Sequence, residues 1–242
     1  MEKIYTIPVN EAFDASRDDH ACGCPFCTLY NMLEDNELEL ILGASMMEPD
    51  VRIKTNEQGF CKTHYDMMFT RKNRLGMALM LESHLNELRE DTNGKGFAAL
   101  KGVGVEAMNR LSELEDDCYV CKRIEFSLAK MFETAVLLWE QDSDFREKLR
   151  AQPYICLPHY RMFVEYARKA LPKKRFPDFY KDVSTVVNTY FDELRGDVSW
   201  FCKKFDYRYD DEPWGNAKDA VERAIKFTSG DIHKGENPLA KK

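Results

Sequence analysis

The sequence predicts an all-α protein made of two tandem helical repeats, each held together by a zinc ion bound to three cysteines and one histidine. Three observations support this prediction. Apolar residues recur at three- and four-residue spacing along most of the chain, which is typical of amphipathic helices. No segment shows a convincing strand-like alternation of apolar and polar residues. A cysteine and histidine pattern also occurs twice at nearly equal spacing.

The repeated pattern consists of a C-x-x-C motif followed by a C-x-x-H motif. Cys24-Pro-Phe-Cys27 precedes Cys61-Lys-Thr-His64 by 33 intervening residues, and Cys118-Tyr-Val-Cys121 precedes Cys156-Leu-Pro-His159 by 34. Cys118 lies 94 residues after Cys24, and Cys156 lies 95 residues after Cys61. This agreement predicts a tandem duplication.

The duplication divides the chain into five predicted segments, with the two repeats packed as one globular unit. These are an N-terminal arm at 1–19, zinc-bound repeat 1 at 20–92, a linker or helix at 93–113, zinc-bound repeat 2 at 114–198, and a C-terminal helical extension at 199–242.

The apolar periodicity places helices in both repeats and in the extension. We expect them at 28–42, 64–91 (as one or two helices), 120–139, 144–150, 157–170, 178–205 and about 216–228. The stretch 51–53 is the one place where a short extended piece is expected.

The residue types and their local spacing favour zinc. Two cysteines separated by two residues direct both sulfur atoms at one ion, and a Cys and His at i and i+3 share one helix face. Three thiolates and one imidazole complete the tetrahedral shell of a structural zinc site. We therefore predict one quartet in each repeat. These are Cys24, Cys27, Cys61 and His64 in repeat 1, and Cys118, Cys121, Cys156 and His159 in repeat 2. Merely buried cysteines and an iron–sulfur cluster are the alternatives.

Composition narrows the class of protein. Charged residues make up 32% of the chain and the net charge is −7. Proteins that bind nucleic acid usually carry a basic surface, so a protein partner is favoured over nucleic acid. No apolar run is long enough to span a membrane, and the first residues lack the pattern of a signal peptide. We therefore expect a cytoplasmic protein whose eight cysteines serve as metal ligands rather than disulfides.

Two further segments carry candidate binding residues. The first segment runs from Ser45 to Arg52, and its candidate residues are Glu48, Asp50 and Arg52. The second is the aromatic and acidic run 205–214, and its candidate residues are Tyr207, Arg208 and Trp214. The first segment is either a pocket for acid–base chemistry or a structural ion pair. The second either caps a groove between the repeats or presents aromatic side chains to a partner.

The motifs resemble a known protein family. The C-P-x-C motif, the segment Gly59-Phe-Cys-Lys-Thr-His64, the stretch Ser45-Met-Met-Glu-Pro-Asp-Val-Arg52 and the run Phe205-Asp-Tyr-Arg208 are similar to an uncharacterised bacterial family, known chiefly from Firmicutes and catalogued as a domain of unknown function. The resemblance extends over nearly the whole chain. It implies no activity and is consistent with metal binding.

Three hypotheses for function follow. The leading one is a non-enzymatic, zinc-stabilised helical module that binds a protein or another macromolecule. The second is an enzyme with a pocket between the repeats near Ser45–Arg52. The third is a thiol-based redox or metal sensor that uses Cys22 and the first zinc site. Both predicted quartets are closed, so we do not expect catalysis by zinc.

Overall fold

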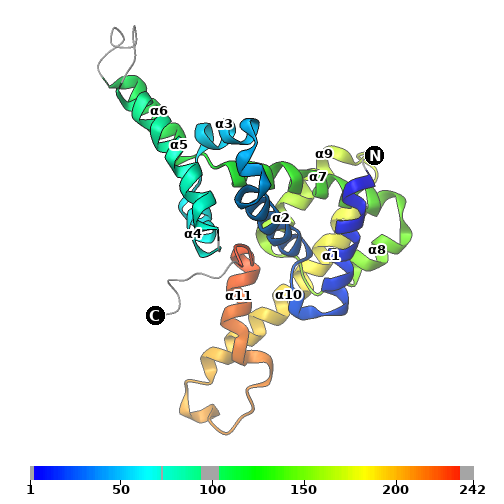
Figure 1. The fold of residues 1–242 in the computed structure, drawn as a ribbon. Helices are drawn as coiled ribbons and strands as arrows, with labels where there is room; N and C mark the ends of the chain where they lie inside the picture. Colours follow the sequence, from blue (N-terminus) through cyan, green and yellow to red (C-terminus); the bar gives the residue numbers. More distant parts are fainter. Residues whose placement is uncertain (1–2, 72, 94–103, 235–242) are drawn as a thin grey trace. The chain divides into compact units, whose positions relative to one another are not determined.

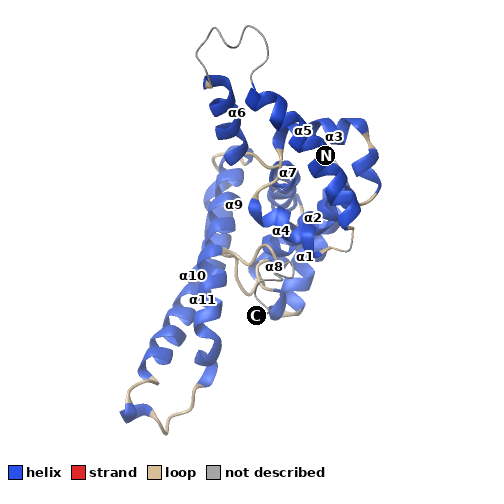
Figure 2. Ribbon diagram, turned by 60° about the vertical axis from the view of Figure 1, so that its left-hand side comes forward, coloured by secondary structure: helices blue, strands red, loops and turns tan. Residues whose placement is uncertain are grey.

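A computed structural model describes residues 3–71, 73–93 and 104–234. These residues form helices and turns and contain no strand, which confirms the predicted all-α class (Figure 2). Among them, no helix combines the length and apolar character that a membrane crossing requires.

The chain divides into two compact units, and two of the boundaries between them fall inside long helices. Unit 1 contains Met1–Asn31 and Leu128–Ile232, and unit 2 contains Met32–Ser127 and His233–Lys242. Two of the three divisions interrupt a continuous helix, α2 (Pro25–Leu42) or α7 (Tyr119–Gln141), and the third, between Ile232 and His233, follows the last helix. Each unit therefore combines segments from both predicted repeats.

Unit 1 contains five further helices. They are α1 (Thr6–Asp18), α8 (Ser143–Arg150), α9 (Leu157–Ala170), α10 (Phe176–Lys203) and α11 (Ala220–Ser229). Helices α10 and α11 pack side by side as a hairpin (Figures 1 and 2). The sequence did not predict α1 as a helix; it buries Val9 and Phe13 completely, so it belongs to the core rather than to a loose arm.

Aromatic side chains form the core of unit 1. Phe26 at the start of α2 stacks on Phe132 of α7 with ring centroids 4.1 Å apart, and it meets Phe163 of α9 at 4.9 Å. Phe163 also meets Phe179 of α10 at 4.9 Å. Each of these four rings is fully buried. Burying large rings removes much apolar surface from water, so this cluster is a main source of stability for the unit.

Unit 2 contains α3 (Pro49–Gln58), α4 (Lys62–Thr70), α5 (Arg74–Asn93) and α6 (Val105–Glu115). Helix α5 packs against both α3 and α6 (Figure 1). The region expected as one or two helices at 64–91 is two, α4 and α5. The expected extended piece at 51–53 was wrong, because these residues lie in the middle of α3, which begins at Pro49 in the favoured first-turn position for proline.

The remaining predicted boundaries agree closely with the helices. Helix α6 begins inside the expected linker or helix at 93–113 and ends at Glu115, just beyond it. Residues 94–103 of that expected segment lie outside the described part. The expected C-terminal extension likewise includes α11, and residues 235–242 lie outside the described part. The duplication itself stays a prediction.

Candidate metal centres

The first cluster of metal-type ligands lies in unit 1 and contains Cys24, Cys27, Cys156 and His159. All four residues are buried. The Nδ1 atom of His159 lies 3.7 Å from the sulfur of Cys24, 3.4 Å from that of Cys27 and 3.1 Å from that of Cys156. The sulfur atoms of Cys27 and Cys156 are 3.7 Å apart.

The second cluster lies in unit 2 and contains Cys61, His64, Cys118 and Cys121. The Nδ1 atom of His64 lies 3.1 Å from the sulfur of Cys61, 3.3 Å from that of Cys118 and 3.5 Å from that of Cys121. The sulfur atoms of Cys61 and Cys121 are 3.9 Å apart.

These separations fit a tetrahedral metal shell. With metal–sulfur bonds of about 2.3 Å and metal–nitrogen bonds of about 2.0 Å, neighbouring sulfurs lie about 3.8 Å apart, and a sulfur and a nitrogen about 3.6 Å apart. The observed distances lie close to these values. They are far longer than a disulfide bond of about 2.0 Å, and all eight cysteines are free.

All four motifs reach their cluster from the start of a helix. Cys61 and Cys156 are the residues just before α4 and α9, while His64 and His159 are the third residues of those helices. Likewise, Cys24 and Cys118 precede α2 and α7, and Cys27 and Cys121 are third residues. The positive end of a helix dipole stabilises thiolates. Three thiolates around a dication carry a net charge of about −1. The helix dipoles therefore favour such a shell.

The predicted grouping of ligands within each repeat was wrong. The first C-x-x-C motif joins the second C-x-x-H motif, and the second C-x-x-C motif joins the first C-x-x-H motif. The exchange follows from packing, because the aromatic core brings the start of α2 beside α9 through the Phe26–Phe163 contact. The eight predicted ligands are thus all brought into clusters, but each cluster contains residues of both repeats.

Burial controls the protonation of the first cluster. It raises the pKa of the Cys24 thiol, so without a cation that thiol stays protonated. Burial also lowers the pKa of His159 to about 4, which keeps its imidazole in the neutral form that binds metals. The backbone N–H of Asp231 donates to the sulfur of Cys27 at 3.3 Å, as expected for an acceptor that carries negative charge.

The second cluster has a carboxylate behind its histidine. The Nε2 atom of His64 lies 3.0 Å from the Oε1 atom of Glu34, which is buried on α2, while Nδ1 faces the sulfurs. Burial alone would lower the pKa of His64, but hydrogen bonds with Cys118, Cys61 and Glu34 raise it to about 11. A metal–histidine–carboxylate chain is the usual way in which proteins orient a ligating imidazole.

His233 extends this series of hydrogen-bonded side chains. Its Nδ1 atom lies 2.5 Å from the same Oε1 atom of Glu34. Burial raises the pKa of Glu34, but hydrogen bonds with His233 and His64 outweigh burial and lower it, so the carboxylate is ionised. Sequence reasoning missed Glu34 and His233 because neither has a spacing that relates it to the C-x-x-H motif.

The three candidate residues in the segment Ser45–Arg52 lie at the start of α3. Glu48 is its N-cap residue and Asp50 lies in its first turn, and both side chains are exposed. Arg52 donates from its Nη2 atom to the carbonyl oxygen of Leu79 at 2.7 Å, which links α3 to α5. Arg52 thus has a structural contact within unit 2. Four cavities occur among the described residues, and the residues that line them do not belong to the segment Ser45–Arg52.

The candidate residues of the run 205–214 lie beyond the end of α10. Tyr207 is 82% exposed, and Arg208 pairs with Asp206. Trp214 packs its ring 5.7 Å from that of Phe201. The ammonium group of Lys204 donates to the carbonyl oxygens of Asp210 and Glu212 at 3.0 and 2.7 Å, which folds the run back on itself. Tyr207 is thus presented to solvent at the tip of the α10–α11 hairpin.

Cys22 lies outside both quartets. It ends the short 3-10 helix His20–Cys22, and its sulfur lies 3.9 Å from the Oδ2 atom of Asp19. Cys202, near the end of α10, is exposed.

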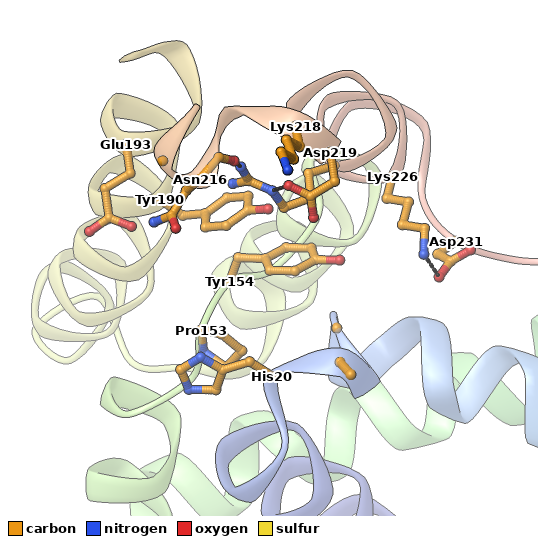
Figure 3. Close-up of a pocket in the computed structure, with 14 residues that line it drawn as sticks. His20, Pro153, Tyr154, Tyr190, Glu193, Asn216, Lys218, Asp219, Lys226 and Asp231 are labelled. Atoms are coloured by element: carbon orange, nitrogen blue, oxygen red, sulfur yellow. Dashed lines mark hydrogen bonds and ion pairs between the residues drawn. The ribbon is translucent and has the colours of Figure 1, made fainter. Parts of the chain in front are cut away.

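A cavity of about 670 Å³ borders the first cluster (Figure 3). The stacked rings of Tyr154 and Tyr190, 4.4 Å apart, form part of its wall, and Lys226 pairs with Asp231 at one side. Gly23 is needed here, because its φ of +73° suits only glycine and a Cβ atom would lie 2.8 Å from the Tyr154 hydroxyl. The lining carries cationic and acidic groups in similar number, so its charge selects no ligand class.

Comparison with known families identifies the family to which the chain belongs. The model of a family of unknown function, DUF6062, matches residues 1–235. The chain belongs to DUF6062. No curated protein and no solved structure matches it. The resemblance seen in the motifs is confirmed at the level of the family, while the bacterial origin stays an expectation. The two Cys3His clusters of this DUF6062 chain are its most specific chemical feature.

Proposed function

We propose that the two clusters are structural zinc sites and that the chain is a zinc-stabilised helical module that binds a protein partner. The observation that carries the metal assignment is the pair of closed quartets, each with three sulfurs and one imidazole nitrogen within 4.8 Å of one another. Zinc prefers this donor set and geometry. A filled tetrahedral shell leaves no coordination position for a substrate, so the ions serve the fold.

Exposed aromatic residues support the proposal of a protein partner. Phe205 and Tyr207 at the hairpin tip are 75% and 82% exposed. Large aromatic side chains are enriched at the centres of protein interfaces, and exposing them to water is unfavourable without such a role. A cytoplasmic location is part of the proposal, since clusters of free thiols persist in a reducing compartment.

Elemental mass spectrometry on protein purified without a metal-affinity tag tests the metal assignment. We expect about two zinc ions per chain. Iron in place of zinc, or metal-free protein that keeps its full thermal stability, would refute it.

Photo-crosslinking in cells that naturally make the protein tests the partner proposal. A photoreactive phenylalanine analogue at position 207 should give one dominant protein adduct, and the same analogue at Lys173, an exposed position of unit 1, should not. Equal labelling from both positions would contradict a docking role for the hairpin tip.

A further inference from the structure

A second cavity in unit 1, of about 270 Å³, lies where α8 and the start of α10 meet the end of α7. Its lining is mostly charged and surrounds one indole ring. The residues are Trp139, Arg146, Arg150, Arg175, Asp178, Lys181 and Asp182. Four of these side chains are cations and two are carboxylates, so the cavity carries an excess of positive charge in a chain whose net charge is −7.

Two of the cations are held against the same ring. The guanidinium carbon of Arg175 lies 5.1 Å from the centroid of the Trp139 ring, and that of Arg146 lies 5.6 Å from it. Trp139 is buried and donates from Nε1 to the Oδ2 atom of Asp182 at 3.0 Å, which fixes the ring. Cation–π contact therefore keeps two like charges together at one wall of the cavity.

The carboxylates of the cavity are already engaged by other groups. Asp182 pairs with Arg150 through two hydrogen bonds of 3.0 Å, and Asp178 pairs with Arg175 at 3.0 Å. Arg146 instead donates to the neutral backbone carbonyls of Trp139 and Glu140, at 2.7 and 3.1 Å. In the ranges that the structure describes, Arg146 and Lys181 have no ion pair. Two positive charges are thus left to face the cavity.

We propose that this cavity binds the phosphate monoester group of a small molecule. A phosphate monoester carries nearly two negative charges near pH 7, which match the two unpaired cations. Guanidinium groups donate to phosphate oxygens with favourable geometry, and the first turns of α10 add the positive end of a 28-residue helix. The cavity volume is near the lower end of small-molecule sites, which favours a compact ligand over a long polymer.

Titration of the purified chain with inorganic phosphate, followed by calorimetry at constant ionic strength, tests this site. We expect saturable binding, weakened about tenfold or more in Lys181→Gln, because a charged hydrogen bond contributes at least about 1.5 kcal/mol. Arg175→Gln should weaken it similarly. Lys181 is exposed, so its variant should keep the parent's melting temperature, which separates loss of binding from loss of fold.

Lys173→Gln is the matched control, since it removes one exposed positive charge close to Arg175 but outside the lining. It should bind phosphate like the parent. Absence of saturable binding in the parent, or an equal loss in Lys173→Gln, would overturn the proposal. Because neither outcome depends on the metal content, failure here is distinguishable from failure of the zinc assignment.

Three further ligands define the chemical class. Glycerol phosphate should bind at least as tightly as inorganic phosphate, and dimethyl phosphate, a singly charged diester, should bind at least about tenfold more weakly. A phosphoserine peptide should bind no more tightly than glycerol phosphate. Tight binding of dimethyl phosphate would overturn the monoester assignment, and preference for the peptide would overturn the small-molecule assignment.

Discussion

Cys27 and Cys156 are 129 residues apart in the sequence, yet their sulfur atoms lie 3.7 Å apart in the first cluster. The corresponding pair in the second cluster, Cys61 and Cys121, is 60 residues apart, with sulfurs at 3.9 Å. Both clusters therefore join a segment of predicted repeat 1 to a segment of predicted repeat 2. A metal ion at each would restrict the unfolded chain across long loops, as well as hold the folded one.

Zinc stoichiometry in double variants tests this exchanged grouping. Cys24→Ser combined with Cys156→Ser removes two ligands from one cluster, so the protein should keep about one zinc ion. Cys24→Ser combined with Cys61→Ser removes one ligand from each cluster and should leave about none. Elemental analysis of both proteins, with far-UV circular dichroism to verify folding, decides the question. The reverse result would mean that ligands group within each repeat.

Chelation should destabilise the whole protein. Metal affinity at structural sites is largely folding free energy, so removing both ions should lower the melting temperature by at least about 10 °C. Circular dichroism melting before and after treatment with a strong zinc chelator measures this. Added zinc should restore the melting temperature and added magnesium should not, because magnesium prefers oxygen ligands. An unchanged melting temperature after verified zinc loss would rule out a structural role.

Glu34→Gln should weaken zinc binding at the second cluster alone. The substitution keeps the size of the side chain but removes the charge that orients His64, and such changes cost roughly 10- to 100-fold in metal affinity. Competition with a colorimetric zinc chelator should reveal one weakened site of two. Glu39→Gln on the same helix is the control, because Glu39 is 74% exposed. Equal affinities in the two variants would show that Glu34 does not support the metal.

Phe132→Ala should be among the most destabilising single substitutions. Phe132 is fully buried and contacts the rings of Phe26 and Tyr166, so its truncation should cost about 3–5 kcal/mol. Phe126 on the same helix is 61% exposed, and Phe126→Ala should change stability by no more than about 0.5 kcal/mol. Chemical denaturation of both variants measures the difference. Similar effects would contradict the assignment of Phe132 to the core.

The sequence by itself determined the helical class, the eight Cys and His residues that form the two clusters, and the local geometry of each motif. These features depend on residues three or four apart, and the 3.6-residue period of a helix relates such neighbours directly. That is why His64 and His159 could be predicted to share a cluster with Cys61 and Cys156. It is also why the boundaries of α9 and α11 lay close to those expected.

Only the tertiary structure decided which motif meets which, and which residues support each cluster. Closing loops of 129 and 60 residues rather than loops of about 35 costs only about 1–2 kcal/mol of extra entropy, because that cost grows with the logarithm of length. The packing of Phe26 against Phe132 and Phe163 outweighs so small a difference. Glu34 and His233 likewise reach His64 through packing between distant segments, a relationship that local spacing does not encode.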